Sequence, residues 1–228
     1  VARDRATVLA AAGTKYSACA TLAALAPLLR EGTAPLAVVG RPCQVAALRK
    51  LEARGEGGAR LALVIGVFCF WALTPAFYRF LASRADLARA AKMDIPKEGG
   101  VVFSANGGAV RIPLDQVRPF IRPACQSCFD PTAEWADVSV GSTEHDPDWN
   151  TLVVRTARGQ ALVDGAVAAG ALEVKPYPAE RLPILRAAVR GKKTRVLAAL
   201  EAGSAEAAYL RLSPVRRAAV RAEPGAGA

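Results

Sequence analysis

The sequence has no apolar run long enough to cross a lipid bilayer. Its longest such run, at 61–73, is shorter than the roughly 20 residues that a membrane helix needs, and we interpret it as a buried strand running into a turn. The N-terminus also lacks the basic region, apolar stretch and small-residue cleavage site of a secretory signal peptide. These absences favour a cytoplasmic protein without a membrane span.

Two common nucleotide-binding signatures are missing as well. The sequence contains no G-x-G-x-x-G and no G-x-x-x-x-G-K-[ST], so a standard dinucleotide fingerprint or P-loop is unsupported. The one histidine, His145, lies in a polar loop, a setting more typical of a surface residue than of a catalytic one. His145 and its loop neighbours Asp146 and Asp148 are nevertheless candidates to donate or relay a proton.

The positive charge is concentrated near the C-terminus. Between 181 and 228, ten lysines and arginines stand against three glutamates, while the whole chain has a net charge of +10. A basic tail can bind nucleic acid or a phosphorylated ligand, but no nucleic-acid motif or aromatic ladder accompanies these charges. We therefore favour a solvated helical tail at 181–228, following an α/β domain at 1–180, and expect no nucleic-acid partner.

The apolar pattern predicts an α/β fold. Short apolar strands at 36–40 and 60–69 flank a helix that opens at 41–55. Continuous apolar strands alternating with helices indicate a parallel sheet buried on both faces. Further helices are expected at 17–31 and at 74–91, where Thr-Pro provides good helix-start chemistry.

The middle of the chain changes character. Two short β runs surround Asn106-Gly107-Gly108, which is a strong hairpin signal. A strand is expected at 136–141, a strand with a glycine-bearing turn at 151–162, and a helix followed by a strand at 162–178. We thus expect a mixed, largely parallel sheet flanked by helices, with a small β-hairpin and a cysteine-bearing insertion.

The five cysteines are an odd number, which argues against a disulfide framework and for reduced thiols with metal or redox roles. We interpret Cys19, inside the first expected helix, as a core residue. Cys43 and Cys69 each come at the end of one of the two apolar strands. Because the carboxyl ends of parallel strands share one edge of the sheet, Cys43 and Cys69 should lie on the same rim.

Cys125 and Cys128 form a C-x-x-C pair between Pro123 and Pro131. Four thiolates can hold zinc or an iron–sulfur cluster. Structural zinc sites usually come as two close pairs, whereas this set has one close pair and two scattered singles at apolar strand ends, so we favour a cluster. The alternative is that the two scattered cysteines are merely small buried hydrophobes.

Several stretches, in this order, resemble the coenzyme F420 hydrogenase/dehydrogenase beta-subunit family. They are "AAGTKY", "LAVVGRPCQVAALRK", "GVFC", "RIPLDQVRPFIRPACQSCFDPTAEWADVSVG" and "WNTLVVRTARG". The combination of P-C-Q, a strand-end F-C, and C-x-x-C followed by the A-D-V-S-V-G strand is specific. The resemblance extends from residue 11 to about 200.

The resemblance implies an oxidoreductase subunit that binds FAD and a 4Fe–4S cluster. Such proteins pass electrons between a redox partner, ferredoxin-like or hydrogenase-like, and a small-molecule hydride carrier such as coenzyme F420. Carried over by position, the cluster ligands are Cys43, Cys69, Cys125 and Cys128. Residues implied near the flavin or framing the first ligand are Gly13, Lys15, Tyr16, Gly40, Pro42 and Gln44.

The sequence departs from the family in two places. The usual N-terminal segment is not seen, so we expect a fragment, and the loop after the A-D-V-S-V-G strand reads GSTEHDPDWN instead of being rich in glycine. Lys15, Arg41, Arg118 and Arg122 are candidates to hold an anionic cofactor tail, although each is also ordinary surface charge. The rival interpretation is a non-catalytic docking module stabilised by zinc or by a cluster.

Overall fold

The structure of the protein is a computed structural model that describes residues 1–14, 16–56, 60–95, 100–104, 109–143, 146, 148–204 and 210–222. Its contacts divide the chain into two units. The hairpin unit consists of Val1–Cys19 and Trp71–Cys125, and the sheet unit consists of Ala20–Phe70 and Gln126–Ala228. The domain boundary predicted after residue 180 stays a prediction, and the C-terminal helices fall within the sheet unit.

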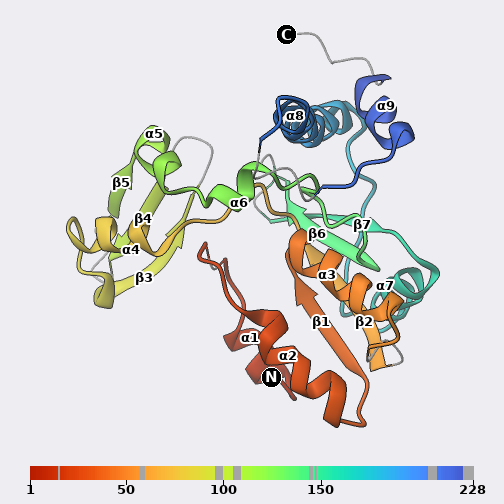
Figure 1. Ribbon diagram of the computed structural model, residues 1–228. Helices are drawn as coiled ribbons and strands as arrows, with labels where there is room; N and C mark the ends of the chain where they lie inside the picture. The colour runs from red at the N-terminus through yellow and green to blue at the C-terminus, as the bar shows by residue number, and fades with distance from the viewer. Residues whose placement is uncertain are drawn as a thin grey trace. The chain divides into compact units, whose positions relative to one another are not determined.

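The sheet unit contains a four-stranded sheet in the order β1-β2-β6-β7 (Figure 1). Its strands are β1 (Leu36–Gly40), β2 (Leu61–Val67), β6 (Val138–Ser142) and β7 (Asn150–Val154). β1 pairs with β2 and β2 with β6 in parallel, while β6 and β7 run antiparallel. The predicted mixed, largely parallel sheet flanked by helices is therefore confirmed.

Helices surround this sheet. They are α2 (Thr21–Glu31), α3 (Pro42–Ala53), α7 (Ala157–Ala168), η4 (Ala179–Arg181), α8 (Leu182–Glu201) and α9 (Pro214–Ala222). Leu25 of α2 and Leu48 of α3 lie in one core cluster with Val64 of β2. α3 begins at Pro42, whose fixed φ and missing N–H suit the first turn of a helix. A helix thus starts immediately after β1, as the sequence predicted.

The hairpin unit holds a second, antiparallel sheet in the order β3-β4-β5. Its elements are α1 (Arg5–Ala10), α4 (Pro75–Ala82), η2 (Leu87–Arg89), β3 (Ala90–Asp94), β4 (Gly100–Ser104), β5 (Ala109–Ile112), α5 (Leu114–Val117) and η3 (Arg118–Phe120). Phe77 and Leu81 of α4 pack against Val102 and Ile112 of the sheet. The β4–β5 pairing confirms the predicted hairpin, whose turn at 106–108 lies outside the described residues. The short α6 (Pro123–Gln126) contains the point at which the chain passes from one unit to the other.

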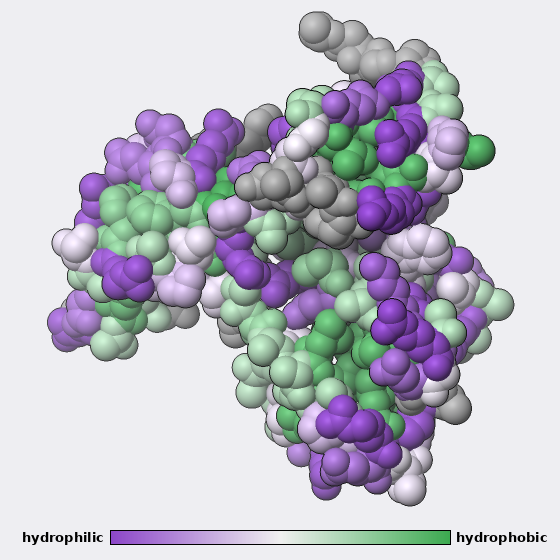
Figure 2. Space-filling view, in the orientation of Figure 1, coloured by the Kyte–Doolittle hydropathy of each residue, from purple (hydrophilic) through white to green (hydrophobic). Residues whose placement is uncertain are grey.

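The C-terminal helices are less solvated than the sequence suggested. Val196 and Leu197 of α8 are buried in a third cluster with Phe129 and Leu212, and Lys192 is only 2% exposed. Figure 2 shows hydrophobic residues (green) beside hydrophilic ones (purple) over α8 and α9. None of the helices in the described ranges is long and apolar enough to span a membrane.

Two helix predictions were wrong in extent. The helix expected at 17–31 begins only at Thr21, so Cys19 lies before it and is exposed, and is not a core residue. The helix expected at 74–91 ends at Ala82, and Ala90–Asp94 forms β3. Pairing of β3 with β4 supplies backbone hydrogen bonds that override the local helical preference of this Ala-rich segment.

Other local predictions also needed correction. The glycine-bearing turn expected within 151–162 is the start of α7, because Thr156 caps the helix by accepting from the Gly159 amide. No strand forms at 171–178. β1 is not buried on both faces, since Val39 is 58% exposed; β1 is an edge strand of the sheet, and this side chain points away from the core cluster.

We expect opposite effects from two alanine substitutions in α7. A Cβ at Gly159 would lie 2.2 Å from the Asp137 carbonyl oxygen, whereas a Cβ at Gly165 meets nothing within 4 Å. Gly159→Ala should lower the free energy of unfolding by about 1–3 kcal/mol through overpacking. Gly165→Ala, the control in the same helix, should raise it by about 0.5–1 kcal/mol. Chemical denaturation measures both, and equal behaviour of the two variants would contradict the close packing of α7 on Asp137.

Candidate functional site

Two of the predicted ligands lie at the carboxyl edge of the parallel strands. β1 and β2 pair in parallel up to the end of β1, where Gly40 lies opposite Gly66. Cys43 follows β1 within the first turn of α3, and Cys69 follows β2. The expectation that both cysteines reach the same rim of the sheet agrees with this topology.

Cys43 shares a cavity with a residue of the C-x-x-C pair. Cys43 is exposed, and together with Cys128 it lines a cavity of about 580 Å³ in the sheet unit. Apolar walls come from α3 and from Phe129 and Leu212. The structure therefore places Cys43, which follows β1, and Cys128, the second cysteine of the C-x-x-C pair, at the same cavity.

The loop after Cys128 is fixed by backbone hydrogen bonds. The Cys69 amide donates to the Pro131 carbonyl at 2.8 Å, and the Cys128 thiol donates to the Asp130 carbonyl at 3.5 Å. The Asp130 carboxylate accepts from the Thr132 and Glu134 amides at 3.0 and 2.8 Å. Burial, together with the charge of Glu134, raises the pKa of the Asp130 carboxyl. This loop is thus held against the segment that carries Cys69.

Cys125 is the last residue of the hairpin unit. Its Sγ accepts a hydrogen bond from the Ala72 amide at 3.4 Å, and the Arg122 amide donates to the Ala72 carbonyl at 2.9 Å. An amide that donates to sulfur stabilises negative charge on a thiolate and tunes the potential of a cluster bound through it. The role of Cys125 as a ligand stays a prediction.

The donor set fits a metal–thiolate centre in its chemistry, because all four residues offer soft sulfur ligands. Three of them, Cys43, Cys69 and Cys128, belong to the sheet unit. Within the described ranges, no group of three or more His, Cys, Asp or Glu side chains converges as a ready metal site. The four-ligand assignment accordingly stays a prediction.

Three of the residues implied near the cofactor build the start of α3. Gly40 ends β1 and Pro42 begins α3. The Gln44 side chain accepts from the Arg41 amide at 3.0 Å and donates to the Thr21 hydroxyl at 2.9 Å. These contacts fix the turn that presents Cys43, which agrees with the expectation that Gly40, Pro42 and Gln44 frame it. Their contact with a cofactor stays a prediction.

The G-T-K-Y element has a structural role in the hairpin unit. The Tyr16 hydroxyl donates to Asp94 Oδ1 at 2.8 Å and accepts from the Ile95 amide at 2.9 Å. Burial and the hydrogen bond with Asp94 raise the pKa of Tyr16 to about 12, so the hydroxyl stays protonated at neutral pH. Gly13 has a positive φ of 98°, and Lys15 lies outside the described residues. Their proposed flavin contacts stay predictions.

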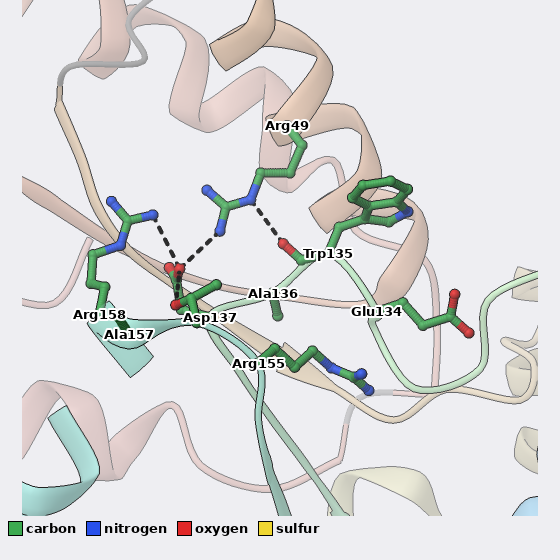
Figure 3. A pocket seen from close by; sticks show the side chains of 9 residues that line it. Arg49, Glu134, Trp135, Ala136, Asp137, Arg155, Ala157 and Arg158 are labelled. Carbon is green, nitrogen blue, oxygen red and sulfur yellow. Dashed lines mark hydrogen bonds and ion pairs between the residues drawn. The ribbon is translucent and has the colours of Figure 1, made fainter. Parts of the chain in front are cut away.

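A buried carboxylate joins several elements of the sheet unit (Figure 3). Asp137 is fully buried. Its Oδ1 lies 3.1 Å from both Arg49 and Arg158 and accepts from the Thr156 hydroxyl at 2.9 Å. Its Oδ2 accepts from the Val64 amide at 2.7 Å. One side chain thereby joins β2, α3 and the start of α7 to the residue that precedes β6.

These contacts decide the ionisation of Asp137. Burial on its own would raise the pKa of the carboxyl, but the hydrogen bonds from Val64, Thr156 and Arg158 and the charge of Arg49 hold the pKa below its ordinary value. The carboxylate borders a cavity of about 530 Å³ that Arg155 and Trp135 also line. Because its lone pairs are already used by the fold, we interpret Asp137 as a structural centre.

The remaining candidates are the residues suggested for a proton relay and for contacts with an anionic cofactor tail, and the structure describes only some of them. Asp146 forms an ion pair with Lys175 at 2.9 Å, and the same ammonium lies 3.9 Å from the centre of the Trp149 ring. His145 lies outside the described residues, so the proton-relay suggestion stays a prediction. The same holds for the cofactor contacts suggested for Arg41, Arg118 and Arg122.

Sequence reasoning missed three residues that shape the site. Asp137 precedes an apolar strand, and its position inside the "EWADVSVG" motif was the available signal. Asp130 follows the C-x-x-C pair closely, as loop-capping residues do. Lys192 was counted among the charges of a solvated tail, but its ammonium donates to the Cys69 carbonyl at 2.9 Å. Nothing in its local sequence distinguishes it from Lys193.

Comparison with known proteins gives consistent matches to one kind of redox protein. Residues 34–180 match a family model described as the C terminus of the beta subunit of coenzyme F420 hydrogenase/dehydrogenase. The coenzyme F420 hydrogenase subunit beta of Methanococcus voltae is 33% identical over 176 residues, which are 74% of this chain and 62% of that protein. The subunit of the same name from Methanosarcina barkeri is 31% identical over 188 residues, covering 77% and 63%.

A solved structure shares the fold. It is that of the F420-reducing NiFe hydrogenase complex from Methanosarcina barkeri, which matches with a TM-score of 0.81 and 27% identity over 88% of this chain and 72% of that chain. The chain spans 62% and 63% of the lengths of the two hydrogenase beta subunits.

We expect Asp137→Asn to lower the free energy of unfolding at neutral pH by about 1.5–3 kcal/mol, because hydrogen bonds to a charged group are lost from a buried site. Folding lowers the pKa of this carboxyl, so its contribution is complete above about pH 4 and is lost as the pH falls further. Denaturation of both proteins across this range measures the difference.

The control is Asp164→Asn, since Asp164 is exposed on α7 and accepts a hydrogen bond from Gln160 on the same helix. It should change the stability little at any pH. A difference between wild type and Asp137→Asn that stays constant from about pH 7 to about pH 2 would contradict the ionised, hydrogen-bonded Asp137.

Proposed function

Because this chain belongs to the coenzyme F420 hydrogenase/dehydrogenase beta-subunit family, we propose that it is the electron-transferring part of an oxidoreductase subunit. In this proposal Cys43, Cys69, Cys125 and Cys128 hold a 4Fe–4S cluster, and FAD binds close to it. Electrons pass between a redox partner subunit and a small hydride carrier such as coenzyme F420, after which the relatives are named.

The observation that carries the proposal is the gathering of cysteines around the carboxyl edge of β1 and β2. Cys43 and Cys128 line one cavity, and the Cys69 amide is bonded to the loop that follows Cys128. Ligands bind at this edge of open parallel sheets because loops there leave a crevice. A disulfide framework gives no reason for thiols to collect at the ends of two separate strands.

The chain's own residues would position and shield such a centre. An iron–sulfur cluster supplies one-electron transfer and a flavin supplies hydride chemistry. The Ala72 amide donates to Cys125 Sγ, and Asp130 fixes the turn after Cys128 by accepting from two backbone amides. Phe129 and Leu212 are buried beside this loop. Such an apolar wall limits solvent access, and solvent access is one of the factors that set a cluster's potential.

The proposed place of FAD follows from the residues that surround Cys43. The implied residues Gly40, Pro42 and Gln44 frame the turn that presents Cys43, so a flavin near them would lie close to the proposed cluster. Tyr16, which the resemblance also implies near the flavin, belongs to the hairpin unit, where its hydroxyl donates to Asp94. The partner is expected to be a hydrogenase-like or ferredoxin-like protein that exchanges single electrons with the cluster.

We expect the anaerobically purified protein to be brown and to contain iron and acid-labile sulfide. Cys128→Ser should remove most of the iron and the broad visible absorbance, because a cluster needs its thiolate ligands. Cys19→Ser is the matched control, since Cys19 is exposed and outside the proposed ligand set, and it should retain both. A colourless wild-type protein with one bound zinc would instead support the docking module.

We also expect the protein to release a yellow, fluorescent flavin on denaturation, in a ratio approaching one FAD per cluster. Chromatography of the supernatant identifies the flavin, and iron analysis gives the ratio. Cluster without any flavin would restrict the role of the chain to one-electron transfer and would refute the FAD assignment.

A further inference from the structure

One buried cation lies beside a proposed ligand. Lys192, on α8, is 2% exposed, and its ammonium donates a hydrogen bond to the Cys69 carbonyl oxygen at 2.9 Å. The same ammonium lies 5.9 Å from the centre of the Phe70 ring. In the described part of the chain, Lys192 forms no ion pair with a carboxylate.

The next residue of α8, Lys193, is also a largely buried cation, but it has a carboxylate partner. Lys193 pairs with Glu134, and the same carboxylate pairs with Arg216 at 3.0 Å. Lys193 is therefore neutralised within the fold, as buried charges usually are. A lysine that is more deeply buried than Lys193, with a neutral carbonyl as its hydrogen-bond acceptor, needs another source of negative charge.

A metal–thiolate centre is such a source. Four thiolates carry more negative charge than a zinc ion or an oxidised 4Fe–4S core carries positive charge, so the complete centre is anionic. Cys69 would hold the centre by its sulfur, while its carbonyl oxygen holds the ammonium. The hydrogen bond thus places a fixed positive charge on the residue that binds the anionic group.

We propose that Lys192 is a positioning and charge-compensating residue for the centre bound by Cys69, and that it raises the reduction potential of that centre. The inference rests on the proposed function for the presence of a cluster. Reduction adds one electron to the cluster, and a nearby positive charge stabilises the added negative charge. Burial strengthens the effect because water does not screen the charge.

The packing of α8 keeps the ammonium in place. Val196 and Leu197 follow Lys192 on α8 and are buried with Phe129 and Leu212. Phe129 directly follows Cys128, so the same helix contacts the carbonyl of Cys69 and the loop of the C-x-x-C pair. A helix anchored on both segments can hold a charge at a fixed place, as a loop lysine cannot.

The test is a redox titration of the cluster in anaerobically purified protein, followed by its visible and magnetic-resonance spectra. Lys192→Met removes the charge and the hydrogen bond, and Lys192→Gln removes the charge but keeps a donor. Both should disfavour reduction about tenfold, which is about 59 mV for a one-electron couple. Lys192→Arg keeps the charge and should retain the wild-type potential.

Lys193→Met is the matched control, because Lys193 is the neighbouring lysine and is already paired with Glu134. It should shift the potential far less than Lys192→Met. Cluster-loaded Lys192→Gln with the wild-type potential would overturn the proposal and leave Lys192 as a packing residue. A potential lowered equally in Lys192→Arg would assign the effect to helix geometry and would also contradict the proposal.

A second measurement needs no cluster and separates this inference from the proposed function. Cys69 is converted to the thiocyanate in protein whose other cysteines are serine, and the nitrile stretching band reports the electric field at that sulfur. Lys192→Gln should move the band and Lys193→Met should leave it in place. An unmoved band in Lys192→Gln overturns the inference, whereas a wild-type protein without iron overturns only the proposed function.

Discussion

The sheet unit depends on the compensation of one buried carboxylate. Asp137 is fully buried directly before β6, and its own amide donates to the Val64 carbonyl while its Oδ2 accepts from the Val64 amide. Asp137 thus extends the β2–β6 pairing by one residue before the first pair of the strand ladder, Ile65 and Val138. Arg49 and Arg158 bring α3 and α7 to the same atoms. Removing this carboxylate would take one acceptor from each of two guanidinium groups and from a β-strand amide, and such losses are costly in a buried network.

The geometry of the cysteines follows from that arrangement. β1, β2 and β6 run parallel, so their carboxyl ends share one edge, and α3 leaves that edge through the turn that holds Cys43. Asp137 fixes the opposite end of β6, and the segment that leads to it from Cys128 lies along β2, from the Cys69–Pro131 hydrogen bond after the end of β2 to Val64 within it. Asp130 fixes the start of this segment by accepting from two of its backbone amides. Strand pairing and loop capping therefore act together on the residues proposed as ligands.

The sequence was informative where a single periodicity or motif decided the structure. The parallel strands at the positions of β1 and β2, the helix between them and the hairpin of β4 and β5 follow from apolar runs that alternate with a helical segment and from a turn signal. The limits of α4 and the existence of β3 do not, because pairing with β4 decides them. The same applies to Gly159, which looked like a turn glycine and is required by the 2.2 Å approach to Asp137. Lys192 is buried because its own helix, α8, packs on the segment of Cys69, which is far away in the sequence. No local pattern of charges encodes such packing.

Two deeply buried charged residues of the sheet unit have different kinds of partner: those of Asp137 include charged groups, whereas those of Lys192 are neutral. Asp137 has an excess of positive charge around it, and the contacts made by its oxygens come from β2, α3 and α7. Lys192 donates to a peptide carbonyl and faces an aromatic ring, both of which are electrically neutral. The same fold pairs two arginines with one aspartate, so buried ion pairs do form in this sheet unit. The difference is understandable if the counter-charge of Lys192 is not an amino-acid carboxylate but the anionic group held by the neighbouring cysteines. The burial of a single ammonium then marks the side of the sheet on which that group belongs.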